Sequence, residues 1–132
     1  MNKANDILNG IYSILSTPNI GTGKTFTRFY KWSYPDSSTD DYFGVINTLQ
    51  IPTDSAQEVD LNVNVYAKDL SKQKGIPDLA TLGTMMDSVI DDLHEYNDGC
   101  FDIEYRFMQV LREEKMQRHF FNLRFNLLFI SN

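Results

Sequence analysis

The residues of this 132-residue chain that could do chemistry are few, and the first candidate is a glycine-rich segment at 21–25. Its sequence, Gly21-Thr22-Gly23-Lys24-Thr25, matches the end of a phosphate-binding loop, in which backbone N–H groups and a lysine hold nucleotide phosphates. The full motif needs a glycine where this chain has Pro18, with a strand before the loop and a helix after it. The hydrophobic pattern gives the reverse order, so we interpret the segment as a turn.

Two histidines, His94 and His119, are the next candidates, because a neutral imidazole can bind a metal or transfer a proton. Either ring would need carboxylates such as Asp91 or Asp98 beside it to hold a metal ion. The histidines fall on different predicted elements, and their spacing matches no metal-binding motif. We therefore expect no metal and no cofactor, and we interpret His94 as a surface residue near a helix C-terminus.

Three acidic residues, Asp87, Asp91 and Asp92, have the chemistry of acid–base carboxylates. Asp87 and Asp91 are one helical turn apart, so they share a face on which like charges repel weakly. That arrangement is typical of a solvated flank, and it also suits a surface presented to a basic partner. Cys100 has no basic neighbour in the sequence to activate its thiol. No catalytic residue emerges, and we expect that the chain is not an enzyme.

An aromatic run from Phe26 to Tyr34 has the side chains that single-strand-binding proteins stack on nucleobases. Few basic residues accompany it, and the chain carries 12 basic and 18 acidic residues, a net charge of -6. Phosphate binding requires clustered Lys and Arg, which makes an acidic chain a poor nucleic-acid binder. We therefore assign the aromatic run to a core and to a subunit interface.

Size and composition fit a single soluble domain over residues 1–132. Hydrophobic residues make up 42% of the chain, enough for a core that buries roughly two thirds of the unfolded surface. No apolar stretch approaches the ~20 residues that cross a bilayer, and the N-terminus lacks the pattern of a signal peptide. The single cysteine excludes an internal disulfide and fits a reducing compartment.

The clearest element is a strand over residues 58–70, because apolar and polar residues alternate along it. Its apolar side consists of Val59, Leu61, Val63, Val65 and Ala67, and its polar side of Asp60, Asn62, Asn64, Tyr66 and Lys68. Before it, the spacing predicts a helix over 3–16, the aromatic strand over 25–34 and a strand over 42–51 that pairs antiparallel with it.

After that strand we expect a helix that begins near Pro77 and is closed by Asn97-Asp98-Gly99. Its apolar stripe consists of Leu79, Leu82, Met86, Val89, Ile90 and Leu93. Two strands over 101–108 and 121–129 then form a hairpin with a charged turn from Arg112 to Arg118. The fold class is α+β: a single antiparallel or mixed sheet with both helices packed on one face, in the order α-β-β-β-α-β-β.

This sheet carries more large apolar groups than one helical layer can cover. Aromatic and apolar residues lie on the side that alternation marks as polar, and they predict an oligomer. The interface candidates are Tyr30, Trp32, Tyr66, Met108 and Leu128. On this interpretation, Tyr66→Asp should weaken assembly and spare the fold.

Four segments together resemble the tail terminator, or tail-completion, proteins of long-tailed bacteriophages. An N-terminal helix, Ile7 to Leu15, leads through a turn to the aromatic strand, and the alternating strand ends Val-Asn-Val-Tyr-Ala-Lys-Asp-Leu. A helix of the Asp-Leu-Ala type follows, and the last hairpin finishes with Arg-Phe-Asn-Leu-Leu-Phe. The resemblance covers nearly the whole chain, as a pattern of elements without a residue-level motif.

The resemblance implies a structural virion protein whose subunits form a ring, expected to be a hexamer. Such a ring caps the tail tube at its head-proximal end, joins it to the head, and lets DNA pass through its lumen without sequence-specific binding. It assembles in the host cytoplasm and contacts the tail-tube and head–tail connector proteins, with no membrane. We expect the lumen or a partner to be faced by Asp87, Asp91 and Asp92, or by the acidic loop 36–41, and a partner ring by the turn from Arg112 to Arg118.

Two alternatives remain at this point. The first is another head–tail connector or a tail-tube protein, with the same architectural role at a different position in the particle. The second, which the residues favour less, is a small-molecule-binding α+β domain or an enzyme with a pocket between helix and sheet. That alternative needs convergent polar groups in a concave site, and the sequence predicts no such cluster.

Overall fold

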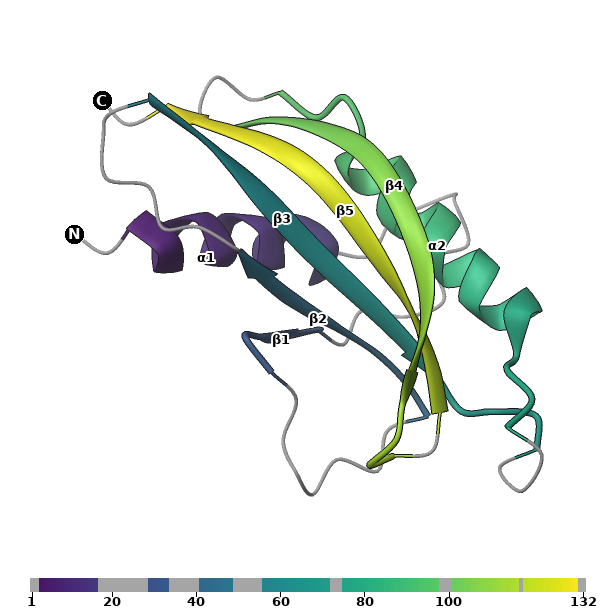
Figure 1. Cartoon of the computed structure of the whole chain (residues 1–132). Helices are drawn as coiled ribbons and strands as arrows, with labels where there is room; N and C mark the ends of the chain where they lie inside the picture. Colours follow the sequence, from purple (N-terminus) through teal and green to yellow (C-terminus); the bar gives the residue numbers. More distant parts are fainter. Residues whose placement is uncertain are drawn as a thin grey trace.

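The computed structural model describes residues 3–16, 29–33, 41–48, 56–71, 75–97, 101–116 and 118–130. In these ranges the elements follow the order α1 (Lys3–Ser16), β1 (Phe29–Lys31), β2 (Tyr42–Thr48), β3 (Ala56–Ala67), α2 (Leu79–Leu93), β4 (Phe101–Glu113) and β5 (Arg118–Ile130). The predicted α+β class, element order and mixed sheet are confirmed (Figure 1). No helix in the described ranges has the length and apolarity needed to cross a membrane.

The strand with the clearest sequence pattern, β3, lies in the middle of a five-stranded sheet ordered β1-β2-β3-β5-β4. It pairs antiparallel with β2, as predicted, and antiparallel with β5 on its other side. β4 pairs antiparallel with β5 in the C-terminal hairpin, and β1 runs parallel to β2. Among the described strands, the two edges of the sheet are therefore the three-residue β1 and the thirteen-residue β4.

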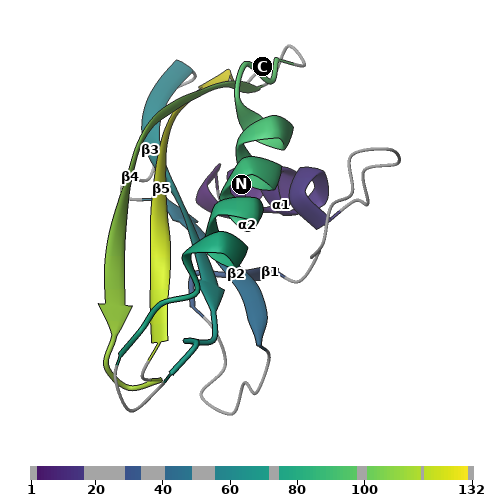
Figure 2. The ribbon, with the colours of Figure 1, turned by 90° about the vertical axis from the view of Figure 1, so that its right-hand side faces the viewer.

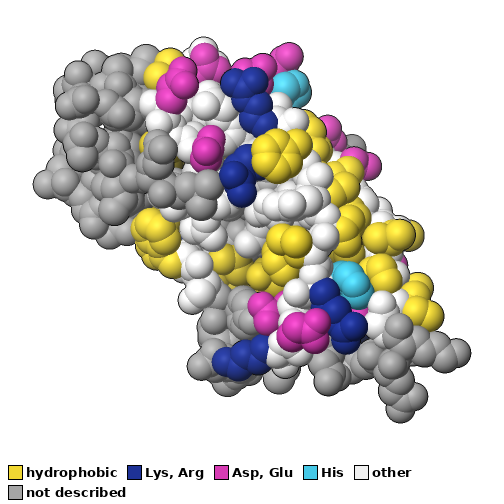
Figure 3. All heavy atoms as spheres, in the orientation of Figure 1, with side chains coloured by type: hydrophobic (Ala, Val, Ile, Leu, Met, Phe, Trp, Pro, Cys, Tyr) yellow, Lys and Arg dark blue, Asp and Glu magenta, His cyan; other side chains and the backbone are white. Residues whose placement is uncertain are grey.

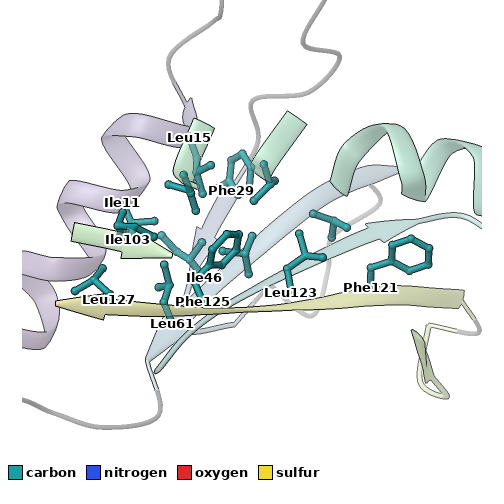
Figure 4. Close-up of a cluster of buried hydrophobic side chains, with 14 of the residues drawn as sticks. Ile11, Leu15, Phe29, Ile46, Leu61, Ile103, Phe121, Leu123, Phe125 and Leu127 are labelled. Atoms are coloured by element: carbon teal, nitrogen blue, oxygen red, sulfur yellow. The ribbon is translucent and has the colours of Figure 1, made fainter. Parts of the chain in front are cut away.

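Both helices cover the same face of the sheet (Figure 2). The alternation along β3 points Val59, Leu61, Val63 and Val65 at that face, where all four are buried. Figure 4 shows the same layer from the side, with Ile11 and Leu15 of α1 above apolar side chains of the sheet. This main core also takes in Leu123, Phe125 and Leu127 of β5, which confirms the hydrophobic alternation predicted for the last strand.

Helix α2 begins at Leu79, two residues after the predicted start near Pro77, and Asp78 is its N-cap. One carboxylate oxygen of Asp78 accepts a hydrogen bond from the backbone N–H of Thr81 at 3.1 Å, and the other accepts one from the Thr81 hydroxyl at 2.7 Å. The predicted apolar stripe is partly wrong. The buried residues are Leu82, Met85, Val89 and Leu93, whereas Met86 and Ile90 are only partly buried and Leu79 is exposed.

The aromatic strand is shorter than the predicted span of 25–34. Strand β1 contains only Phe29–Lys31, and residues 25–28 and 34 lie outside the described ranges. Trp32 has a φ of 72°, which takes the backbone out of the extended region and ends the alternation there. The ring of Phe29 packs so closely over Gly44 that a Cβ at position 44 would lie 2.4 Å from it. Because Gly44 has no side chain, the ring of Phe29 can be buried against strand β2.

Strand β4 contains a bulge that reverses the predicted sidedness of its second half. Its pairing with β5 shifts register between Tyr105 and Phe107, so Arg106 is an extra residue. Tyr105 lies opposite Phe125 on the helix-covered face, but beyond the bulge Met108 occupies that face and Phe107 the other. The expectation that Met108 lies on the polar side of the hairpin is wrong for this reason.

The charged turn of the hairpin is also shorter than predicted. The strands continue to Glu113 and resume at Arg118, with Arg112 opposite His119 and Glu113 opposite Arg118. Only residues 114–117 connect them, so Arg112 and Arg118 are strand residues, and the expected projecting turn from Arg112 to Arg118 is wrong.

Candidate assembly surface

The face of the sheet opposite the helices is the part of the molecule with the most unusual composition, and Figure 3 looks onto it. Residues directly opposite one another on paired strands share a face, so the register defines cross-strand rows there. One row is aromatic, the next is built from amides, and the third brings a cation onto an aromatic ring. We call this surface the open face.

The aromatic row is a stack of three rings from three strands. Tyr66 of β3 lies between Phe43 and Phe120, with ring centroids 4.7 Å and 4.6 Å apart and nearly parallel planes. Tyr30 meets the edge of Phe43 at 5.7 Å, and the guanidinium of Arg118 lies 5.8 Å from the centroid of the same ring. Offset and edge-to-face contacts of this kind are favourable beyond the area that they bury. The row therefore forms a small second core on the open face.

This second core changes the interpretation of Tyr66. Only 5% of the residue is exposed, because its ring is stacked on both sides within the chain. Tyr66→Asp would place a carboxylate inside this stack, so from the structure we expect it to destabilise the fold as well as any assembly. The polar side of β3 is thus partly a packing surface of the single chain.

The amides of the second row and those of the third row form one hydrogen-bonded network across four strands. Asn62 Nδ2 donates to Asn47 Oδ1 at 2.9 Å, and Asn122 Nδ2 donates to Asn64 Oδ1 at 2.6 Å and to Asn62 Oδ1 at 3.4 Å. Gln109 Nε2 donates to Asn122 Oδ1 at 3.3 Å, which extends the network to the edge strand β4. Asn62 and Asn122 are each 6% exposed, so these amides satisfy one another in place of water.

The third row places Arg124 on the ring of Phe107. The guanidinium carbon lies 5.4 Å from the ring centroid, a cation–π arrangement. The Nε atom of Arg124 is buried and has no hydrogen-bond partner in the described part of the chain. Phe107 itself is exposed at the edge, so the bulge that turns it to the open face also gives Arg124 its support.

Within the described ranges, large hydrophobic side chains are exposed at three places besides Tyr12 of α1. The β1 margin has Trp32 and Tyr42, and the β4 margin has Phe107, Val110 and Leu111. A third site, which we call the α2 approach, consists of Leu70, Ile76 and Leu79 around the segment that leads into α2. The Leu70 N–H donates to the carbonyl of Ile76 at 2.9 Å, which places these two residues side by side just before Leu79 begins α2.

The predicted interface residues are divided among these environments. Trp32 is exposed at the β1 margin, and Tyr30 is half-buried against the aromatic stack. Leu128 is half-buried on the open face, directly opposite Glu58 and Asp102. Met108, by contrast, packs on the main core under the helices. The structure thus brings Tyr30 and Tyr66 together, while Trp32, Met108 and Leu128 each lie elsewhere.

The predicted partner-facing charges are likewise divided. Asp87 and Asp91 are exposed on α2, and Asp92 is half-buried. Arg112 is exposed, with its Nε atom 3.9 Å from a carboxylate oxygen of Glu114. Arg118 is 7% exposed and donates to the backbone carbonyl of Asp41 at 3.3 Å. Its burial contradicts the expectation that it projects toward a partner.

A buried polar pair, Asp69 and His119, is not predicted from the sequence, although His119 was a candidate there for metal binding. Asp69 Oδ1 lies 3.0 Å from both the backbone nitrogen and the ring Nδ1 of His119. The side chain of Asp69 is fully buried, directly after the end of β3. Nothing in the local sequence separates Asp69 from the other acidic residues, because its partner lies fifty positions away.

The two histidines have separate structural roles. His94 caps the end of α2 and accepts a hydrogen bond on Nδ1 from the backbone N–H of Tyr105 at 3.1 Å. Within the described ranges, no three His, Cys, Asp or Glu side chains are placed to hold a metal ion. Asp98, Cys100, the loop 36–40 and the glycine-rich segment 21–25 lie outside those ranges.

Comparison with protein-family models gives no match to this chain, and comparison with curated proteins gives no match either.

Proposed function

We propose that this chain is a structural virion protein that resembles phage tail terminators and assembles into a six-membered ring. The ring caps the tail tube at its head-proximal end and joins it to the head. In this proposal the protein acts in the virion after assembly in the host cytoplasm, with the tail-tube protein and head–tail connector proteins as partners. It is an architectural subunit, not an enzyme.

The observation that carries this proposal is that the described part of this small chain exposes apolar side chains at three separate sites. A ring subunit needs two different surfaces for its two neighbours and a further one for an axial partner. The β1 margin and the β4 margin lie at opposite edges of the sheet, and the α2 approach lies apart from both along the chain. An enzyme of this size requires one concave site, and exposed apolar groups at its margins would only favour aggregation.

Charge supports the same role. A net charge of -6 repels the DNA that passes through the lumen of a tail, so the acid balance favours passage without adhesion. The exposed carboxylates Asp87 and Asp91 of α2 are the described residues that we place toward the lumen or a neighbouring ring. A head–tail connector at another position has the same surface requirements and is the alternative within the architectural class.

Light scattering after size-exclusion chromatography, combined with negative-stain electron microscopy, tests the proposal. We expect closed rings for the unmodified chain, and smaller species for Trp32→Glu, which places a charge at the β1 margin. Ser13→Glu on the exposed side of α1, outside all three apolar sites, is the matched control, and it should leave the rings intact. Two findings together would contradict the proposal. The first is that the purified protein stays monomeric at high concentration, and the second is that no capsid, portal or tape-measure genes lie beside its gene.

A further inference from the structure

Among the described strands, β4 has a neighbour on one side only, so the backbone groups on its other side have no partner strand there. It pairs with β5 on one side only, and Figure 2 shows it at the left margin of the ribbon, with both helices to its right. Edge strands in native proteins are normally protected by charged residues or proline. The segment Phe107–Leu111, Phe-Met-Gln-Val-Leu, contains neither. This segment is therefore a template on which another strand can pair.

The same segment is self-complementary about Gln109. Two apolar residues precede the glutamine and two follow it, so the pattern of apolar and polar residues is the same in both chain directions. In an antiparallel pairing centred on Gln109, Phe107 lies opposite Leu111 of the second copy, and Met108 lies opposite Val110. The faces also agree, because Phe107, Gln109 and Leu111 share the open face while Met108 and Val110 share the helix-covered face.

The rows of the open face supply an independent argument, because two of them stop at this edge. The amide network ends at Gln109, which is exposed, and a second Gln109 opposite it would continue the network into the next copy. The aromatic row ends at Leu111, which lies opposite Phe120. In the same pairing, Leu111 would meet Phe107 of the second copy, whose ring carries Arg124.

We propose that the Phe107–Leu111 segment of β4 pairs antiparallel with the same segment of a second copy, about a two-fold axis through Gln109. The contact joins two five-stranded sheets into one of ten strands and buries the exposed side chains of the β4 margin. Arg106 and Arg112 limit the pairing to this segment, because they would oppose each other across the axis. Their partners within the chain are exposed and distant, Glu104 at 3.6 Å from Arg106 and Glu114 at 3.9 Å from Arg112, so most of this repulsion remains.

This contact buries the β4 margin and leaves the β1 margin and the α2 approach uncovered. A ring of dimers, or two rings back to back, can contain it when those two surfaces bind the neighbours within each ring. A single six-fold ring contains no two-fold axis of this kind.

Disulfide cross-linking tests the contact and its register. In a Cys100→Ser background, Gln109→Cys should form a covalent dimer under mild oxidation, because the two introduced thiols face each other across the axis. Leu111→Cys alone should not, since it lies opposite Phe107, whereas the Phe107→Cys/Leu111→Cys double variant should. Intact-mass spectrometry under non-reducing conditions measures the fraction of each variant that is a disulfide-linked dimer. Absence of dimer for both Gln109→Cys and the double variant, or efficient cross-linking of Leu111→Cys alone, would overturn the proposal.

A second measurement does not depend on introduced thiols. Leu111→Lys places a charge on the edge, and in sedimentation-velocity experiments it should raise the dimer dissociation constant at least about tenfold. Leu79→Lys, at a leucine of the α2 approach that is more exposed than Leu111, is the matched control and should leave that constant unchanged. Equal effects of the two lysines would refute pairing at β4. Rings without Gln109 cross-links would contradict this contact alone, and cross-linked dimers without rings would contradict the ring alone.

Discussion

The two faces of the sheet solve the same packing problem in different ways. The helix-covered face is mainly aliphatic and aromatic, with Leu61, Leu123 and Phe125 fully buried under α1 and α2. The open face has no helix over it among the described elements, yet Asn62, Tyr66 and Asn122 are nearly as buried. It achieves this by lateral contacts, in which rings stack on rings and amides bind amides across neighbouring strands.

This difference shows that burial on a sheet does not require a covering layer. A fully covered face is stabilised by the removal of apolar area from water, a non-directional effect. The open face is stabilised by directional contacts between cross-strand neighbours, each of which contributes roughly 0.2–1 kcal/mol. We therefore expect substitutions on the two faces to differ both in size and in how they combine.

The largest effect is expected on the helix-covered face. Phe125 is fully buried and meets the edge of Tyr105 with the ring centroids 5.5 Å apart. Phe125→Ala should lower the free energy of unfolding by about 3–5 kcal/mol, because it removes apolar contacts and leaves a cavity. Urea unfolding followed by circular dichroism measures the change. Phe125→Leu, which keeps most of the volume, should cost less than about 1.5 kcal/mol.

A smaller loss is expected when the aromatic stack of the open face is interrupted. Tyr66→Ala should lower the free energy of unfolding by about 2–4 kcal/mol, because Phe43 and Phe120 both lose a stacked neighbour. Tyr66→Phe keeps the ring and serves as the control. A cost below about 1 kcal/mol for the alanine variant would show that the stack contributes little, and the contrast between the faces would have to be abandoned.

The smallest loss is expected in the amide network. Asn122→Ala should cost about 1–3 kcal/mol, since the amides of Asn62, Asn64 and Gln109 lose a partner. Asn126→Ala, two positions along the same strand and only half-buried, is the matched control and should stay within about 0.5 kcal/mol of the unmodified chain. A double-mutant cycle with Asn62→Ala sharpens the comparison: cooperative amides should give a non-additive pair, and strict additivity would argue against a network.

The sequence by itself determined the class of the fold and its element order. The alternation of β3 was sufficient to identify which side chains the helices would bury, because a strand directs successive side chains to opposite faces. The start of α2 near Asp78 and the C-terminal hairpin were also predictable, since capping and alternation are local properties. These features depend on residues a few positions apart.

Only the tertiary structure decided the composition of the open face. A one-residue bulge moved Met108 under the helices and brought Phe107 to the edge, and no local pattern announces such an insertion. The burial of Tyr66 depends on Phe120, and the burial of Asp69 on His119, residues about fifty positions away in the chain. The order of the strands in the sheet brings these residues together, because it decides which segments of the chain lie side by side. The self-complementary edge at Gln109 depends on both. The sequence gives the symmetric pattern of its side chains, and the tertiary structure places that segment at the edge of the sheet.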